Sequence, residues 1–393
     1  SMTIFIQFSA SDSAILYEPF FKASMTVLSG RGLTSVTMHL ELEQFGDGFF
    51  QEQHRLESGM SRDKIARVIS DSREKYLIQT DQGIMRATMT GKLRHGAETR
   101  RDLPAVGDWV AFTRADNENA VIDALFPRRT NLERSAVGKL DVQIIAANVD
   151  TAFVVISADR DFRVNRIDRY LALILNGGID PVVLINKCDL LADGDWRELE
   201  MQIFRRHPAV EIIGTSLVTG LGLDSVRQMM QPGRTFCFTG SSGVGKSSLI
   251  NHFAGAQLLA TSQVSETTGR GCHTTTSRNL HMLPGGALLL DTPGMREVAM
   301  SDVENGVGET FAEIEALAAR CRFSDCTHTS EPGCAIIAAI ASSEIDAAAF
   351  SSYQKLKRES ARFEQKMHER HRVDKNFGKM VREVLKVKKM LKG

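Results

Sequence analysis

Hydrophobic and polar residues alternate in short segments over the first third of the chain. Five strand-like segments follow one another, at residues 64–70, 75–80, 84–90, 108–114 and 120–126, and glycine or proline separates them. Five short strands so close together are typical of a small closed barrel. The pattern therefore predicts an OB-like β-barrel over residues 61–132. Residues 1–60 lack such a pattern, and we expect a partly disordered leader or arm there.

The pattern changes to that of an α/β fold from residue 133 to residue 305. Nearly continuous apolar runs at residues 151–157 and 181–186 are typical of buried parallel strands. Between them, residues 164–176 place their apolar side chains on one helical face. Further strands are expected at residues 210–214, 235–238 and 288–290, with helices near 196–206, 223–230 and after 247. This alternation predicts a mostly parallel sheet with crossover helices.

A glycine-rich loop follows the predicted strand at residues 235–238. Residues 240–247 fit the pattern G-x-x-x-x-G-K-[ST], in which backbone amides and a helix N-terminus surround phosphate groups. Lys246 is predicted to reach the β- and γ-phosphates, and Ser247 to ligate Mg²⁺. The predicted nucleotide contacts from this loop are Gly240, Ser241, Ser242, Gly243, Val244, Gly245, Lys246, Ser247 and Ser248. A kinase shares this loop, so the loop alone leaves that alternative open.

Three further segments at strand ends point to guanine. Asn186, Lys187 and Asp189 form an N-K-x-D sequence, whose aspartate can accept two hydrogen bonds from guanine N1 and N2. Adenine lacks these donors. Thr215 and Ser216 follow the next strand, where the backbone of GTPases reads guanine O6. Asp291 and Gly294 belong to a D-x-x-G sequence, in which the aspartate holds Mg²⁺ through water and the glycine amide senses the γ-phosphate.

The order of these motifs differs from that of ordinary GTPases. The guanine-reading segments at residues 186 and 215 precede the phosphate loop at residue 240, which in turn precedes Asp291. The same sheet can assemble when the chain ends are relocated, because termini often lie close together. The order therefore predicts a circularly permuted P-loop GTPase.

Residues 306–393 contain a cluster of cysteines and a basic tail. Cys321, Cys326, His328 and Cys334 supply three thiolates and one imidazole, which suit a closed, structural Zn²⁺ site. Residues 355–393 hold fourteen Lys or Arg against five Asp or Glu in a helical pattern, although the whole chain has a formal net charge of zero. A helical zinc-binding domain is expected here. The charges are compatible with a solvated helix, with rRNA and with a membrane surface; beside a zinc module and a barrel we favour RNA.

These features together resemble the ribosome small subunit-dependent GTPase A (RsgA/YjeQ) family over residues 39–393. Residues 103–110 (LPAVGDWV), 147–150 (ANVD) and 271–276 (GCHTTT) also fit that family. The resemblance implies slow GTP hydrolysis that the small (30S) ribosomal subunit stimulates, and a role late in maturation of that subunit. It further implies contact with 16S rRNA through the barrel and the zinc domain.

The sequence has no glutamine at the position where other GTPases orient the attacking water. Met295 follows the D-x-x-G sequence, and a thioether cannot orient water. His273 is the candidate, because it lies in the segment between the phosphate loop and Asp291; the family has a histidine there that is implicated in catalysis. A histidine with only structural contacts is the alternative. Thr275 is predicted to ligate Mg²⁺ together with Ser247 and Asp291, with Thr274 or Thr276 as alternatives, and Lys246 completes the predicted catalytic set.

The composition of the chain guides the expectations for its location and partners. No apolar run approaches the roughly 18 residues of a membrane span, and no signal peptide is evident, so we expect a cytoplasmic monomer that does not bind membranes. A non-catalytic, GTP-gated RNA-binding adaptor is the main alternative to an enzyme. The basic connection that holds Lys92, Arg94, His95, Arg100 and Arg101 is either a solvated loop or an RNA contact.

Overall fold

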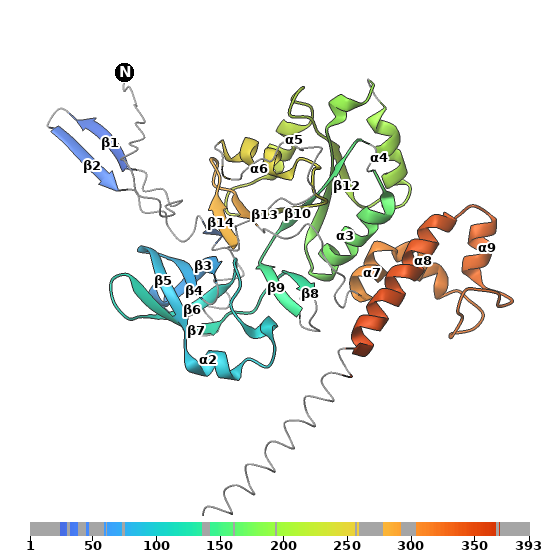
Figure 1. The fold of residues 1–393 in the computed structure, drawn as a ribbon, viewed down its shortest axis with the longest axis horizontal. Coiled ribbons are helices and arrows are strands. Elements are labelled where there is room, and N and C mark those ends of the chain that lie inside the picture. The colour runs from blue at the N-terminus through green and yellow to red at the C-terminus, as the bar shows by residue number, and fades with distance from the viewer. Residues whose placement is uncertain are drawn as a thin grey trace, which may run out of the picture.

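The structure is a computed structural model. It describes residues 24–29, 32–37, 45–46, 59, 61–72, 75–135, 142–159, 162–192, 195–255, 258, 278–291, 304–366 and 369. Within these residues the chain forms a small barrel, a central sheet with helices on both faces, and a helical C-terminal part (Figure 1). These are the three parts of the predicted fold class.

The barrel consists of five strands, β3 (Ile65–Ser72), β4 (Lys75–Thr80), β5 (Gly83–Met89), β6 (Trp109–Arg114) and β7 (Asn119–Leu125). Strand β3 pairs with both β4 and β6, so the order β3-β4-β5-β7-β6 closes on itself. Alternate side chains point inward, and Val68, Ile78, Val110 and Ile122 lie fully buried in a core of their own. The closed barrel predicted from the sequence is confirmed.

The connection between β5 and β6 contains two short helices where a loop was expected. They are α2 (Gly91–Gly96) and the 3₁₀ turn η3 (Arg100–Asp102). The Thr90 side chain accepts a hydrogen bond from the backbone N–H of Leu93 and so caps α2. The five predicted basic residues of this connection, Lys92, Arg94, His95, Arg100 and Arg101, are all exposed.

The central sheet has five parallel strands, β10 (Thr151–Ser157), β11 (Asp180–Asn186), β12 (Glu211–Gly214), β13 (Thr235–Thr239) and β15 (Leu288–Asp291). They lie side by side in the order β12-β11-β10-β13-β15. In a parallel sheet all carboxyl ends share one edge, so the residues that follow these strands meet there. The mostly parallel sheet is therefore confirmed.

Helices cover both faces of this sheet. They are α3 (Val164–Asn176), α4 (Trp196–Phe204), α5 (Leu223–Met229) and α6 (Lys246–Ala254) (Figure 1). Val154 of β10 packs in one buried cluster with Leu171 of α3. The next residue, Val155, packs on the opposite face with Leu249 of α6. Apolar residues on both faces explain why the strand sequences are nearly continuous apolar runs.

The barrel and the central sheet share hydrogen-bonded strands. Strand β14 (Arg278–Met282) is antiparallel to β15 on one side and to β3 of the barrel on the other. The result is one sheet of eleven strands that runs from the five parallel strands through β14 into the barrel. The sequence did not predict β14, because most of its side chains are polar.

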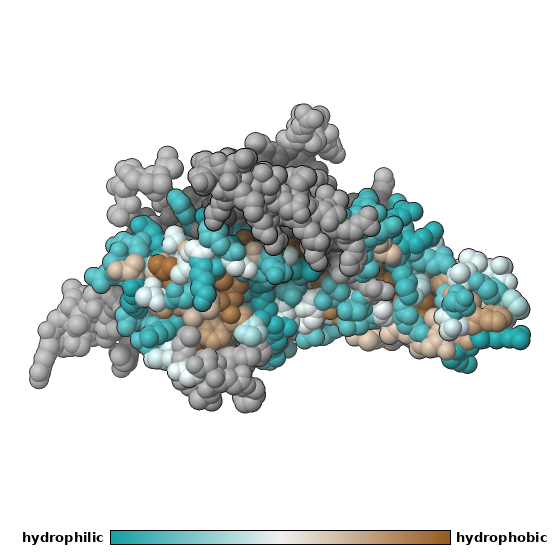
Figure 2. Space-filling model, turned by 90° about the horizontal axis from the view of Figure 1, so that it is seen from below, coloured by the Kyte–Doolittle hydropathy of each residue, from teal (hydrophilic) through white to brown (hydrophobic). Residues whose placement is uncertain are grey.

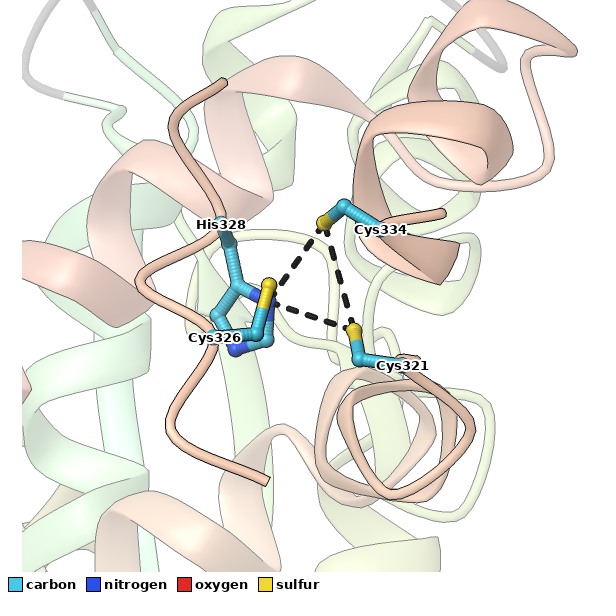
Figure 3. Close-up of side chains that lie close together, drawn as sticks. All are labelled: Cys321, Cys326, His328 and Cys334. Carbon is cyan, nitrogen blue, oxygen red and sulfur yellow. Dashed lines mark hydrogen bonds between the residues drawn. The ribbon is translucent and has the colours of Figure 1, made fainter. Parts of the chain in front are cut away.

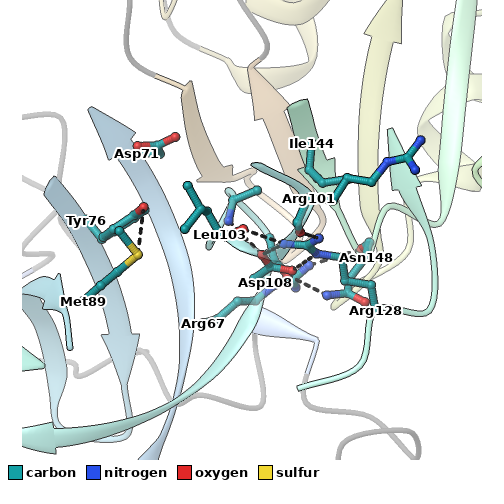
Figure 4. A network of polar contacts seen from close by, with 12 residues as sticks. Arg67, Asp71, Tyr76, Met89, Arg101, Leu103, Asp108, Arg128, Ile144 and Asn148 are labelled. Atoms are coloured by element: carbon teal, nitrogen blue, oxygen red, sulfur yellow. Dashed lines mark hydrogen bonds and ion pairs between the residues drawn. The ribbon is translucent and has the colours of Figure 1, made fainter. Parts of the chain in front are cut away.

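A buried arginine fastens several segments at this junction. Arg67 of β3 is 2% exposed, and its guanidinium donates hydrogen bonds to the carbonyl oxygens of Phe45, Gly107 (3.3 Å) and Asn148 (3.3 Å) and to Thr235 Oγ1 (2.8 Å). Figure 4 shows Arg67 beside Asn148 in this network. Burial lowers the pKa of Arg67 to about 10, so the side chain stays charged at neutral pH. The residue thus links the N-terminal arm, the barrel and β13.

Two hairpins lie outside the predicted elements. Strands β8 (Asn131–Ser135) and β9 (Val142–Ala147) pair between the barrel and the central sheet. Strands β1 (Ser24–Ser29) and β2 (Gly32–Thr37) pair within the segment expected to be a loose arm. Figure 1 shows this second hairpin away from the barrel.

The C-terminal part is helical. It contains α7 (Glu304–Thr310), α8 (Ala312–Ala318), α9 (Ala335–Ala341) and a helix over residues 347–366. Helix α7 lies directly on α3, since a Cβ added at Gly306 would stand 1.8 Å from the carbonyl oxygen of Ala172. Only glycine permits that approach. Of the predicted basic tail, residues 370–393 lie outside the described residues.

A buried carboxylate joins the C-terminal part to the central sheet. Asp168 of α3 is fully buried; Arg206 Nη1 lies 3.0 Å from one of its oxygens and His207 Nε2 lies 2.7 Å from the other. The second nitrogen of the same guanidinium, Arg206 Nη2, lies 2.9 Å from Asp346, directly before the helix that begins at residue 347. Arg206 therefore bridges carboxylates from both parts.

The described surface is mainly hydrophilic on the face shown in Figure 2, and hydrophobic residues there form separate patches. Among the residues with described structure, none of the helices is both long and apolar enough to span a bilayer.

Candidate nucleotide site and metal centre

The glycine-rich loop lies between β13 and α6, the strand–loop–helix context that its sequence requires. Gly240, Gly243 and Gly245 all have positive φ angles, of 136°, 82° and 97°. A Cβ at Gly240 would lie 2.1 Å from the carbonyl oxygen of Val155 on the neighbouring strand. The loop can therefore take this path only with glycine at its first position.

The lysine side chain of the loop folds back onto the loop backbone. Lys246 Nζ donates hydrogen bonds to the carbonyl oxygens of Gly240 (2.7 Å) and Ser241 (2.5 Å). Ser242 is exposed, and Ser247 and Ser248 are half-buried in the first turn of α6. A nucleotide phosphate over this loop would meet the helix N-terminus and the ammonium group together.

The N-K-x-D segment turns sharply at the end of β11. Lys187 has a left-handed backbone with φ of 62°, and Asn186 is buried (3% exposed). Asp189 Oδ1 accepts a hydrogen bond from Ser216 Oγ at 2.5 Å, and Asn186 Oδ1 accepts one from Thr215 Oγ1 at 3.2 Å. All five predicted guanine-reading residues thus lie together at the ends of β11 and β12.

The guanine-reading segment and the phosphate loop contact each other directly. Asn186 Nδ2 donates a hydrogen bond to the carbonyl oxygen of Val244 at 2.8 Å, and Lys187 Nζ donates one to that of Gly243 at 2.8 Å. A Cβ at Gly245 would stand 2.3 Å from Asn186 Nδ2. Segments that are far apart and in reversed order along the chain therefore form one continuous site at the carboxyl edge of the sheet.

Asp291 ends β15 at this same edge. Burial raises the pKa of Asp291 to about 6. The remaining predicted residues of the D-x-x-G and switch segments, His273, Thr275 and Gly294, lie outside the described residues. Their roles remain predictions.

Comparison with known proteins agrees with this geometry. The RsgA GTPase family model matches residues 125–301. The chain is 40% identical over 363 residues to small ribosomal subunit biogenesis GTPase RsgA 2 of Vibrio parahaemolyticus, an alignment that covers 91% of this chain and 96% of the relative. The chain belongs to the RsgA GTPase family. Another relative, small ribosomal subunit biogenesis GTPase RsgA of Opitutus terrae, is 44% identical over 75% of this chain and 83% of its own.

Two solved structures share the fold. The crystal structure of YjeQ from Thermotoga maritima has a TM-score of 0.58 and 26% identity, and the match covers 76% of this chain and 98% of that one. YloQ, described as a circularly permuted GTPase, has a TM-score of 0.55 and 22% identity over 76% of this chain and 94% of its own. The printed description of YloQ matches the permuted order of motifs in this sequence.

The predicted metal ligands gather in one cluster of the C-terminal part. Figure 3 shows Cys321, Cys326, His328 and Cys334 turned toward a common point, and their ligand atoms all lie within 4.8 Å of one another. His328 Nδ1 is 3.5 Å from the sulfur atoms of both Cys321 and Cys334, which are 3.9 Å apart. Zn–S bonds of about 2.3 Å and Zn–N bonds of about 2.0 Å in a tetrahedron place sulfur atoms about 3.8 Å apart and sulfur and nitrogen about 3.5 Å apart. The cluster can hold a metal ion of this kind.

The loop between the ligands is fixed by one carboxylate. Glu331 accepts hydrogen bonds from the backbone N–H groups of Thr327 (2.9 Å), Thr329 (3.0 Å) and Ser330 (3.1 Å). The hydrogen bonds from the Thr327 side chain and these amides hold the pKa of Glu331 well below its usual range. The loop that carries His328 is thereby held in place.

One contact near the phosphate loop was not foreseen from the sequence. Arg166 Nη1 of α3 donates a hydrogen bond to Ser241 Oγ at 3.1 Å. Arg166 lies on the polar side of a helix whose apolar face was the evident signal. Nothing in the sequence separates Arg166 from the other charged residues of α3; only its hydrogen bond to Ser241 does.

Proposed function

We propose that this protein binds GTP and hydrolyses it to GDP and phosphate during late maturation of the small (30S) ribosomal subunit. The observation that carries this proposal is the hydrogen bond between Asn186 and Val244, because it joins a guanine-selective segment to a phosphate loop. The names of the relatives, small ribosomal subunit biogenesis GTPases, support the choice of subunit. A cytoplasmic location follows from that partner.

In this proposal the N-K-x-D segment selects the base. The Asp189 carboxylate accepts hydrogen bonds from guanine N1 and N2, and the Lys187 stem lies along the base. Asn186 holds the segment against the phosphate loop. The backbone after Thr215 and Ser216 receives guanine O6.

The phosphate loop and its surroundings then hold the triphosphate. Amides of residues 240–248 donate to phosphate oxygens, and Lys246 turns from the loop carbonyl groups to the β- and γ-phosphates. Ser247, Thr275 and Asp291 would hold Mg²⁺, which would neutralise charge on these phosphates.

His273 is the proposed catalytic residue, because Met295 stands where related GTPases use a glutamine. In this role the imidazole positions the attacking water, and Gly294 senses the γ-phosphate. Slow turnover of the free protein is expected, since the chain lacks the usual water-orienting amide.

RNA contact is proposed for the barrel and the C-terminal part. The exposed basic residues of α2 and η3 suit a phosphate backbone. We propose a structural Zn²⁺ at the Cys321, Cys326, His328 and Cys334 cluster, as the sulfur and nitrogen spacings support. The protein is expected to act on 16S rRNA within the subunit as a monomer, without a membrane partner.

The experiment is GTP hydrolysis by the purified protein alone, with small ribosomal subunits and with large subunits. We expect slow turnover alone, clear stimulation only by small subunits, and no hydrolysis of ATP. His273→Ala is expected to keep GTP binding but to lose the stimulated turnover. Binding to small subunits without any phosphate release would favour the adaptor, and equal use of ATP would overturn the proposal.

A further inference from the structure

A row of three polar residues crosses the junction between the barrel and the central sheet. Asn279 of β14 pairs directly with Asp291 of β15 on one side and with Ser70 of β3 on the other. Neighbouring strands are about 4.8 Å apart, so Ser70 lies only about 10 Å from Asp291. The row connects a barrel strand to the carboxylate proposed to hold Mg²⁺.

The three side chains share one face of the sheet. Residues directly opposite each other on paired strands point to the same side. Their neighbours along the strands, Leu280 and Leu290, pack in the cluster on the α3 face. Asn279, Asp291 and Ser70 therefore point to the other face, the one covered by α6 and the phosphate loop.

A hydrogen bond fixes the orientation of the middle residue. Ser70 Oγ donates to Asn279 Oδ1 at 2.7 Å, and Ser70 is 8% exposed. The oxygen and nitrogen of a carboxamide diverge from one carbon atom. The oxygen of Asn279 is thus bound toward β3, and Asp291 is the directly opposite residue on β15; the contacts of the described residues include no hydrogen bond between the Asn279 and Asp291 side chains.

Arg278, the residue before Asn279 on β14, also connects this strand to the barrel. Arg278 of β14 is paired with Asp71 of β3, and its guanidinium lies 4.0 Å from the Asp71 carboxylate. Arg278 Nη1 also donates to the carbonyl oxygen of Ile144 at 3.3 Å. The start of β14 is thus held by the barrel and by β9 together.

We propose that Asn279 is a positioning residue for Asp291, and that Ser70 of the barrel sets the direction of the Asn279 amide. When Mg²⁺ and GTP are bound, an N–H of Asn279 would reach the Asp291 carboxylate on the adjacent strand and orient it toward the metal. This inference rests on the proposed GTP-binding function. It also makes the barrel a contributor to the magnesium site, through a side chain that touches neither metal nor nucleotide.

The test uses the full-length variants Asn279→Leu, Asn279→Asp and Ser70→Ala. His281→Leu is the matched control, because His281 lies on the same strand and face but pairs with Leu289. A fluorescent, non-hydrolysable GTP analogue is titrated at increasing Mg²⁺ and, separately, in EDTA. Thermal melting checks that each variant folds.

Asn279→Leu is expected to raise the Mg²⁺ concentration for half-maximal tight binding roughly tenfold, as for a lost hydrogen bond to a charged group. Binding in EDTA should stay unchanged. Asn279→Asp should raise this Mg²⁺ concentration further, because the substitution places a second carboxylate beside Asp291. Ser70→Ala removes one oxygen and should raise the Mg²⁺ concentration for half-maximal binding by about threefold. Because this substitution is small, the test does not depend on the larger changes at Asn279.

The outcomes separate this inference from the function on which it rests. If the unsubstituted protein shows no Mg²⁺-dependent binding of guanine nucleotide, the proposed function itself is wrong. If that binding is present but the Asn279 and Ser70 variants need no more Mg²⁺ than the His281→Leu control, Asn279 has no positioning role. Equal losses in Mg²⁺ and in EDTA would assign these residues to folding only.

Discussion

The contact between Asn186 and the phosphate loop allows a quantitative test of the site. Asn186→Ala removes the 2.8 Å hydrogen bond to the carbonyl oxygen of Val244 and the acceptor for Thr215 Oγ1. Asn186 and Val244 are 3% and 5% exposed, so water cannot easily replace the lost partner. A buried carbonyl group left without a donor costs about 1–3 kcal/mol. Since the loop is then no longer held in its binding conformation, nucleotide affinity should fall roughly tenfold to a hundredfold.

The contact between Asn186 and the phosphate loop can also be disturbed by a substitution in the loop. Gly245→Ala places a Cβ 2.3 Å from Asn186 Nδ2, at a backbone φ of 97° that side chains rarely adopt. Its effect on affinity should equal or exceed that of Asn186→Ala. In the double variant the shortened side chain removes the collision, so the two losses should not add.

The assay is equilibrium titration with a fluorescent GDP analogue, together with thermal melting. Asn119→Ala is the control, because Asn119 makes a comparable 3.0 Å side-chain hydrogen bond to Asp116 but lies on the exposed surface of the barrel. An Asn186→Ala variant that binds within about twofold of the unsubstituted protein would refute the reasoning. Fully additive losses in the double variant would show that the two residues act separately.

Three further outcomes are expected. Cys326→Ser, or a strong chelator, should release one zinc ion per chain, measured by atomic absorption, and lower the melting temperature of the C-terminal part. Arg206→Leu leaves the buried Asp168 carboxylate with only His207, which should cost roughly 3 kcal/mol and lower the melting temperature by several degrees in calorimetry. Because the pKa of Asp291 is raised to about 6, protons should compete with Mg²⁺ there, so Mg²⁺-dependent nucleotide affinity should fall as the pH drops below about 6 and stay level above about 7.

The sequence predicts well whatever depends on local pattern. The five barrel strands lie within two residues of their expected positions, since alternation and glycine or proline breaks mark them. The strands β10 and β11 were clear because burial on both faces demands apolar residues in succession. The meeting of the N-K-x-D segment and the glycine-rich loop was predictable in the same way, because each motif is a short segment at a strand end.

Contacts between distant segments were not predictable from such patterns. Strand β14 has one buried apolar residue, Leu280, and becomes a strand because β15 and β3 supply partners on both sides. The hydrogen bond of Asn279 with Ser70 depends on that register. The buried position of Arg67 at the junction could not be predicted either, because a charged residue on a strand is expected to face solvent unless its partners are known.

The relocated chain ends place the C-terminal helices at an unusual point of the covalent chain. In the usual motif order, the polypeptide that follows the D-x-x-G sequence goes on to build the remainder of the sheet. Here residues 292–303 alone separate Asp291 from α7, which is clamped on α3. The C-terminal part is therefore attached to the molecule in two ways: covalently, a short distance along the chain from Asp291, and by packing, through α7 on α3.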